Sequence, residues 1–248
     1  MFAFQDTAAP VEIAFTDRHG GVSGGPYASL NLAEPGSAAA PAAESDAVRR
    51  NVDLVVRAFT GAGDGAPTPS VVRMRQVHGS EVAVADPAAA TPTADGLVTR
   101  DPGVVLMVRV ADCVPVLLAD PHAGVVGAAH AGRPGLVAGV VPATVDAMRE
   151  LGARQVRAWV GPHVCGRCYE VPEQMRADVA AAVPESFAET SWGTPAVDIG
   201  AGVRTQLERA GVQLTEVSRC TLEDDDLYSY RRQGTESGRL AGLVWRRP

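Results

Sequence analysis

The stretch GVVLMVRVADCVPVLLADPHAGVVGAAHAGRPG, residues 103–135, decides how this chain folds. Two apolar runs within it, residues 104–110 and 114–118, are rich in β-branched side chains and too short for ordinary helices. A third apolar run covers residues 124–129. Continuous apolar runs of this length are typical of strands that are buried on both faces. We therefore expect this stretch to form buried strands.

The ends of the expected strands carry residues that can bind a metal. Cys113 lies between the first two apolar runs, and His130 ends the third. Upstream, residues 71–77 form another strand candidate, and that run ends at His78. Three strand ends thus carry one thiol and two imidazoles, which is a ligand set that zinc accepts.

The remaining pattern predicts a mixture of strands and helices. Further strands are expected at residues 11–15, 81–85, 97–99, 156–160, 216–221 and 240–245. Helices are expected at residues 47–59 with Asp46 as the cap, 135–151 with Pro142 near the start, 172–183 and 197–210. Because these elements do not alternate strictly and no repeat is found, we expect one α+β sandwich over residues 1–248 rather than a doubly wound sheet.

Composition narrows the functional classes. The chain has 46% hydrophobic and 21% charged residues and a formal net charge of −7, so we expect a soluble globular protein that does not bind nucleic acid. Residues 1–6 do not resemble a signal peptide, and no apolar stretch is long enough for a membrane span. Four cysteines without a secretion signal favour reduced thiols in the cytoplasm. Monomer and homodimer are both open.

The Cys and His residues at the strand ends admit several chemistries. A catalytic zinc site uses three protein ligands and leaves a fourth position for water or substrate. A single copper ion also binds two His and one Cys, although five His in the whole chain cannot hold the four coppers of a multicopper oxidase. A third hypothesis makes Cys113 a nucleophile with His130 as its base. In the simplest alternative these side chains are unrelated and buried separately.

Two other segments contain residues that can bind a metal or an anion. Cys165 and Cys168 form a single C-x-x-C motif without a second ligand pair, so we interpret them as ordinary thiols. Arg231, Arg232 and Arg239 lie close together near the C-terminus, and guanidinium groups suit phosphate or carboxylate. These arginines equally suit a solvated face that balances the acidic run at residues 223–226.

The chain resembles the YfiH-like family, also called laccase-domain or polyphenol-oxidase-like proteins. The matching segments are FTDRHGGVSGGPYASLNL (15–32), RQVHGSEV (75–82), ADGLVTRDPGVVLMVRVADCVPVLLAD (94–120), GVVGAAHAG (124–132), GPHVCGRCYEV (161–171), and SYRRQG with SGR (229–239). They extend over nearly the whole chain, and the QVHG, ADC-x-P and AAHAG segments are specific in combination.

The resemblance implies a fold, a metal site and an activity. The implied fold is a four-layer α/β/β/α sandwich of mixed sheets. The implied zinc ligands are His78, Cys113 and His130. The implied activity is phosphorolysis of adenosine or inosine to ribose 1-phosphate and base, together with cleavage of 5′-methylthioadenosine and deamination of adenosine. Older naming points to copper-dependent polyphenol oxidation, and some members are connected with editing of cell-wall precursors.

Two positions depart from the family pattern. Where the family commonly has HAGWRG, residues 130–135 place Arg133 at the Trp position and Pro134 at the Arg position. The family's Asn-Arg pair is Asn51-Val52 in this chain. We expect both changes to affect substrate or anion contacts, while the three metal ligands are intact.

Our leading hypothesis is a zinc-dependent purine nucleoside phosphorylase that takes a purine nucleoside and phosphate. The first alternative is a Cys-His hydrolase or amidase acting on cell-wall peptides, the second a non-catalytic zinc-binding protein, and the third a copper oxidase. His19 and Asp95 are candidates for protonating the leaving base. The residues expected to contact substrate or phosphate are Arg18, Asn31, Gln76, Asp95, Arg133, Arg231 and Arg232.

Overall fold

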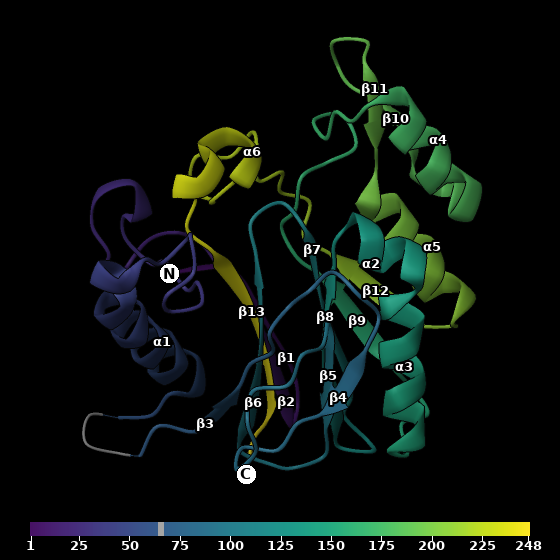
Figure 1. Cartoon of the computed structure of the whole chain (residues 1–248). Coiled ribbons are helices and arrows are strands. Elements are labelled where there is room, and N and C mark those ends of the chain that lie inside the picture. The colour runs from purple at the N-terminus through teal and green to yellow at the C-terminus, as the bar shows by residue number, and fades with distance from the viewer. Residues whose placement is uncertain (64–66) are drawn as a thin grey trace.

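The computed structural model describes residues 1–63 and 67–248, and Figure 1 shows the arrangement of their elements. The strands are β1 (Phe2–Ala8), β2 (Val11–Thr16), β3 (Ser70–Val72), β4 (Val82–Val84), β5 (Gly96–Thr99), β6 (Val104–Val110), β7 (Val114–Asp120), β8 (Val125–Ala131), β9 (Arg157–Val160), β10 (Phe187–Glu189), β11 (Pro195–Val197), β12 (Gln213–Glu216) and β13 (Leu240–Arg246). The helices are α1 (Ser45–Thr60), α2 (Arg133–Ala138), α3 (Val140–Glu150), α4 (Glu173–Ala182), α5 (Ile199–Arg209) and α6 (Tyr230–Gln233).

Two mixed sheets packed face to face form the centre of the described part of the chain. The first sheet has the order β1-β2-β13-β6-β3, and the second has the order β12-β9-β7-β8-β5-β4. Helix α1 covers the outer face of the first sheet, and α2, α3 and α5 cover the outer face of the second (Figure 1). The layers are therefore α/β/β/α, and the expected α+β sandwich is confirmed.

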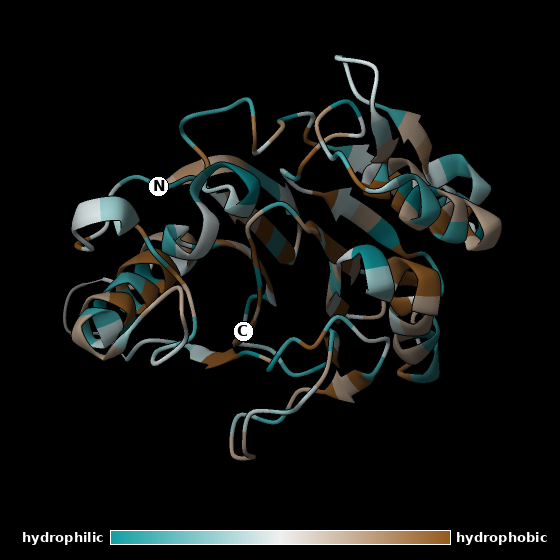
Figure 2. Ribbon diagram, turned by 45° about the horizontal axis from the view of Figure 1, so that its top comes forward, coloured by the Kyte–Doolittle hydropathy of each residue, from teal (hydrophilic) through white to brown (hydrophobic). Residues whose placement is uncertain are grey.

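Burial on both faces explains the apolar runs of the central strands. In β6, Leu106 belongs to the core between the sheets, whereas its neighbour Val105 packs with residues of α1. In β7, Leu117 faces the other sheet and Leu118 faces the helices of the second sheet. Because successive side chains alternate between two buried faces, nearly every position is apolar, with Arg109 in β6 and Asp120 at the end of β7 as the charged exceptions. Figure 2 shows the same concentration of hydrophobic residues on the central strands.

The helices differ from the sequence prediction at their ends. The helix expected at residues 135–151 is two helices, α2 and α3, because Gly139 between them has φ 82° and breaks the helical path. Asp46 is not the cap of α1, since the helix already begins at Ser45 with Glu44 in the cap position. Among the described helices, none combines the length and the apolar character needed to cross a membrane.

Two predicted strands differ from the structure. The strand expected at residues 71–77 is only β3, because the Gln76 side chain donates to the Arg109 carbonyl (2.8 Å) and accepts from its N–H (3.0 Å) where a ladder would continue. The strand expected at residues 216–221 was misplaced, since β12 covers Gln213–Glu216 and shares only Glu216 with that range. Strands β1, β10 and β11 were not predicted, since residues 2–8 are only partly buried or exposed and the other two are three residues long.

We predict that Leu117→Ala lowers the free energy of unfolding by about 2–5 kcal/mol, because it leaves a cavity between the two sheets. The Leu117 side chain is fully buried there. Leu54→Ala on the outer side of α1, where Leu54 is 38% exposed, should change stability by less than about 1 kcal/mol. Denaturant titration of both variants measures the difference, and equal losses would contradict this description of the core.

Candidate metal centre

Strand register brings three of the candidate residues together. Strands β7 and β8 are antiparallel with Val114 opposite Ala131, so Cys113, just before β7, lies beside the end of β8 that carries His130. Strand β5 pairs with the other side of β8, with Gly96 opposite Ala129. The backbone N–H of His130 donates to the carbonyl of Asp95 (2.8 Å), which precedes β5. One edge of the second sheet therefore holds Cys113, His130 and Asp95.

Asp95 fixes the positions of both histidines. Its fully buried carboxylate accepts backbone N–H groups from Val77 (3.1 Å), His78 (3.0 Å) and Gly79 (2.7 Å). The same carboxylate lies 2.8 Å from Nδ1 of His130. The turn held in this way gives His78 a left-handed backbone with φ 62°. A carboxylate behind a histidine ring is the arrangement that orients metal ligands in proteins.

The side chains of His78, Cys113 and His130 converge, and we call them the His-Cys-His cluster. Their donor atoms all lie within 4.8 Å of one another, with Cys113 Sγ 3.7 Å from His78 Nε2. Zinc bonds of about 2.0–2.3 Å in tetrahedral geometry separate neighbouring ligand atoms by roughly 3.3–3.8 Å. The donor types and their spacing fit one zinc ion, and three protein ligands leave a fourth position for another molecule.

Gly132 makes room for this convergence. A Cβ atom at Gly132 would lie 2.5 Å from Cδ2 of His78 and 3.2 Å from Sγ of Cys113. Any side chain at Gly132 would therefore push the His78 ring away from the thiol. The Gly in the HAG segment is thus a steric requirement of the His-Cys-His cluster.

The electrostatics of the cluster favour a thiolate. Burial acts to raise the pKa of Cys113, but the charge and hydrogen bond of His130, together with His78, outweigh it and lower that pKa to about 6. Burial acts to lower the pKa of His130, while Cys113 and Asp95 raise it to about 9. The pKa of Asp95 is lowered, because its bonds to His130, Gly79 and Val77 outweigh the effect of burial. A thiolate is the form of Cys that binds a metal.

A cavity of about 670 Å³ adjoins the cluster. The lining includes all three residues of the His-Cys-His cluster. It also includes four arginines but only two carboxylates, which are those of Glu34 and Asp112. The arginines are Arg75, Arg109, Arg231 and Arg239. Glu34 pairs with Arg109 at 2.5 Å, and Asp112 accepts from the hydroxyl of Thr221 and the backbone N–H of Arg231. The excess of positive charge favours an anionic ligand.

Two of the expected substrate contacts line the cavity. Gln76 lines the cavity, and its side-chain amide makes two hydrogen bonds to the backbone of Arg109. Arg231 donates from Nη1 to the carbonyl of Glu170 (2.7 Å), and its guanidinium lies 4.5 Å from the centre of the Tyr169 ring. Arg231 is therefore held in a fixed orientation at the cavity wall.

Two of the expected phosphate ligands, Arg18 and Arg232, lie outside the lining. Arg18 packs over the Tyr228 ring and donates to the carbonyl of Ala28. Arg232 directs its guanidinium at four backbone carbonyls, which are those of Thr221, Leu222, Asp224 and Leu227. In this geometry both side chains hold loops together.

Other expected residues support the cavity from behind or lie apart from it. Asn31 is fully buried, and its side-chain oxygen accepts the backbone N–H of Arg239 (3.0 Å). Asp95 is buried behind the His-Cys-His cluster and does not line the cavity. His19 bonds to Asp226 at the surface (2.8 Å), also outside the lining. Neither candidate for the proton donor therefore faces the cavity.

The two departures from the family pattern also lie away from the lining. Arg133 begins α2 and is not a lining residue. Val52 packs with the core between α1 and the first sheet. The preceding residue, Asn51, is fully buried and bonds to Val22, Ser23 and the carbonyl of Asn31. In this structure neither departure contributes a residue to the cavity lining.

Several residues of the cavity lining were not expected from the sequence. The lining contains two further arginines, Arg75 and Arg109. It also contains two aromatic side chains, Tyr169 and Tyr230. The sequence does mark Arg109, because it is the only charged residue inside the apolar run 104–110. In the structure its side chain is only 8% exposed. Such a charge must meet a buried partner or a cavity.

Comparisons with known proteins agree with this architecture. The family model described as "multi-copper polyphenol oxidoreductase laccase" matches residues 12–247. A Streptomyces coelicolor protein named purine nucleoside phosphorylase SCO2081 is 53% identical over 251 residues, which cover 99% of each chain. A Deinococcus radiodurans protein named purine nucleoside phosphorylase is 42% identical, and the match covers 93% of this chain and 87% of that protein.

Two solved structures share the fold. The crystal structure of protein NMB0706 from Neisseria meningitidis has a TM-score of 0.82 at 32% identity, with 100% of this chain and 99% of that chain covered. The crystal structure of YlmD from Geobacillus stearothermophilus has a TM-score of 0.83 at 30% identity, with 97% of this chain and 93% of that chain covered.

We predict that Asp95→Asn weakens zinc binding by about 10- to 100-fold, as removal of a supporting carboxylate does at other metal sites. The amide of Asn cannot accept from three N–H groups and His130 at once. Competition with a chelator measures the affinity, and Asp101→Asn at an exposed position is the control. Unchanged zinc affinity in Asp95→Asn would contradict the role given to this carboxylate.

Proposed function

This chain belongs to the laccase-domain family, and we propose that it is a zinc-dependent purine nucleoside phosphorylase. The observation that carries the proposal is the His-Cys-His cluster at the wall of an arginine-lined cavity. Relatives up to 53% identical that are named purine nucleoside phosphorylase support the reaction class. The proposed reaction converts adenosine or inosine and phosphate to ribose 1-phosphate and the free base.

The cluster suits one zinc ion better than a multi-copper centre. His78, Cys113 and His130 would hold the ion, and within the described residues only two imidazoles belong to this cluster. A multi-copper site needs many more histidines than these. When bound, zinc supplies a Lewis acid that polarises an oxygen of a ligand in the fourth position.

The cavity residues supply binding and charge. A volume of about 670 Å³ is in the range of small-molecule sites and admits a nucleoside with phosphate. The lining arginines would bind phosphate beside the ribose, and Tyr230, which is 49% exposed, would stack on the purine. The C1′–N bond breaks and its electron pair leaves with the base, while a phosphate oxygen bonds to C1′. A held anion stabilises the positive charge that develops on the sugar.

We extend the proposal to two related reactions of the same site. 5′-Methylthioadenosine has the same purine and ribose core and differs in its 5′ substituent. Hydrolytic deamination of adenosine would use the same binding position for the purine, with water as the nucleophile, as in zinc deaminases.

We predict that the zinc-loaded protein releases free base from inosine, adenosine or 5′-methylthioadenosine only when phosphate is present. Cys113→Ala should lose this activity, because the cluster then keeps only its two imidazoles. Chromatography of the products and metal analysis of each sample measure both effects. Deamination would appear as inosine formed from adenosine without phosphate.

The control is His122→Ala, which removes an imidazole outside the cluster and outside the cavity lining. It should retain both zinc and base release. Full phosphorolysis by metal-free protein would refute the zinc requirement, and an active Cys113→Ala protein would refute the role of the thiol.

A second candidate function is a Cys-His hydrolase acting on cell-wall peptides. The lowered pKa of Cys113 beside His130 favours it, since a thiolate next to imidazole is an activated nucleophile. We expect zinc to protect Cys113 from iodoacetamide, measured by peptide mass spectrometry on zinc-loaded and metal-free protein side by side. Alkylation that zinc does not slow, with loss of peptide hydrolysis, would favour the hydrolase instead.

A further inference from the structure

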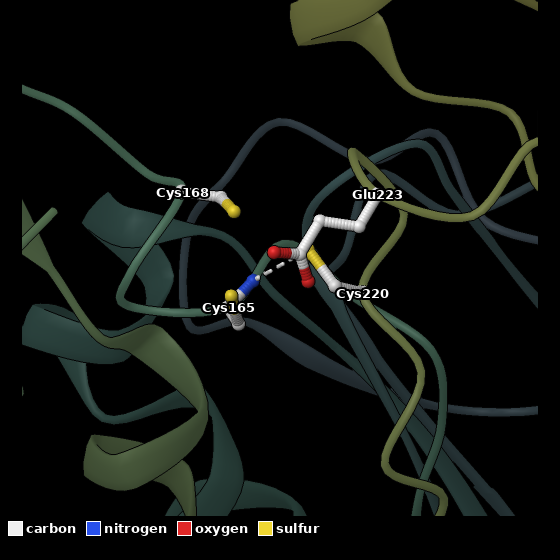
Figure 3. Close-up of side chains that lie close together, drawn as sticks. All are labelled: Cys165, Cys168, Cys220 and Glu223. Atoms are coloured by element: carbon white, nitrogen blue, oxygen red, sulfur yellow. Dashed lines mark hydrogen bonds between the residues drawn. The ribbon is translucent and has the colours of Figure 1, made fainter. Parts of the chain in front are cut away.

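A second group of ligand-type side chains lies outside the cavity lining. It consists of Cys165, Cys168, Cys220 and Glu223, which we call the thiol cluster. From their convergence we infer that these four side chains form a second, structural zinc site. Their donor atoms all lie within 4.8 Å of one another, and Figure 3 shows the three sulfurs and the carboxylate directed toward a common point.

Two similar turns supply the ligands in pairs. Cys165 and Cys168 lie on a turn after β9, in which the N–H of Cys168 donates to the carbonyl of Cys165 (2.9 Å). Cys220 and Glu223 lie on a turn after β12 with the same spacing. Strands β9 and β12 are parallel neighbours, so their carboxyl ends lie at the same edge of the sheet. A bridge between His163 and Cys220 continues this pairing up to the thiol cluster.

Backbone donors surround one of the sulfurs. The N–H of Cys165 donates to Sγ of Cys220 at 3.4 Å, drawn as a dashed line in Figure 3. Burial raises the pKa of Cys220, while hydrogen bonds from the backbone of Cys165, Leu222 and Glu223 act to lower it. Several N–H groups directed at one sulfur stabilise a thiolate and orient a metal ligand.

The remaining thiols lack a compensating positive charge within the thiol cluster. Cys168 is 4% exposed, and burial together with the neighbouring Cys165 and Cys220 raises its pKa. Protonated thiols need no counter-ion, but ionising them beside one another and beside Glu223 is costly unless a cation lies between them. A divalent metal removes this cost, because a coordinating thiol is deprotonated by the ion itself.

The donor set selects zinc and a closed site. Three sulfurs and one carboxylate oxygen complete a tetrahedral shell without an open position, which is the structural type of zinc site. All three cysteines are free in the structure. A disulfide would use two sulfurs and would leave the third thiol and Glu223 without a role.

The position of the thiol cluster indicates what the metal would stabilise. Val164 and Tyr169 flank the first turn and line the cavity. Thr221, in the second turn, donates to Asp112 (2.7 Å), the residue before Cys113. The N–H of Val164 donates to the carbonyl of Asp112 (3.0 Å). A metal that joins the two turns would therefore fix one wall of the cavity.

The test is zinc stoichiometry of the full chain after removal of metal and reconstitution with zinc under reducing conditions. We expect two zinc ions per chain in the wild type and one in Cys113→Ala, which leaves the thiol cluster intact. Cys168→Ser should also bind one, and His19→Ala, outside both clusters, should bind two. With cobalt, the sulfur-to-metal absorption should be stronger in Cys113→Ala, with three thiolates, than in Cys168→Ser, with one.

A single zinc ion in the wild type that is lost in Cys113→Ala would overturn the inference. A disulfide among these cysteines in protein purified under reducing conditions would overturn it as well. If Cys168→Ser does not fold, Glu223→Gln at an exposed position replaces it, and unchanged zinc retention against a chelator would count against the site. Loss of base release leaves these measurements unaffected, so this inference and the proposed function fail separately.

Discussion

The bonds to the buried carboxylate of Asp95 are the constraint on which the candidate metal centre depends. One side chain accepts three successive backbone N–H groups of the His78 turn and also holds the ring of His130. The two histidines come from chain segments 52 residues apart, and this carboxylate joins them on a rigid sheet edge. In a buried network of this kind, loss of one acceptor leaves several donors unsatisfied, so the geometry of the site is set cooperatively.

The layered fold could be predicted from the sequence because burial on both faces leaves a direct trace. The runs at residues 104–110 and 114–118 are strands with the expected bounds or nearly so. The errors arise where side chains replace backbone partners or where one residue changes direction. Gln76 takes over the hydrogen bonds of a strand, and the positive φ of Gly139 divides a helix whose apolar spacing is continuous. Neither effect alters hydrophobic periodicity, so periodicity cannot reveal it.

The site was only partly readable from the sequence. The convergence of His78, Cys113 and His130 agrees with the expected ligand set, because strand ends at one edge of a sheet approach one another. Phosphate contacts were harder to predict, since an arginine can bind a ligand or the carbonyls of its own chain. Arg232 binds carbonyls, whereas Arg109 lines the cavity from the middle of an apolar strand. Only the tertiary path of the backbone separates the two cases.

The same limit explains why the thiol cluster is invisible to motif analysis. A single C-x-x-C lacks a partner in the sequence, and its partner is a Cys-x-x-Glu turn 52 residues after Cys168. Parallel pairing of β9 with β12 brings the two turns together, so the sheet rather than the spacing creates the ligand set. The two clusters then differ in one physical respect. The His-Cys-His cluster offers three ligands beside a cavity and would leave a bound metal open to another molecule, whereas the thiol cluster offers four ligands and would enclose the metal.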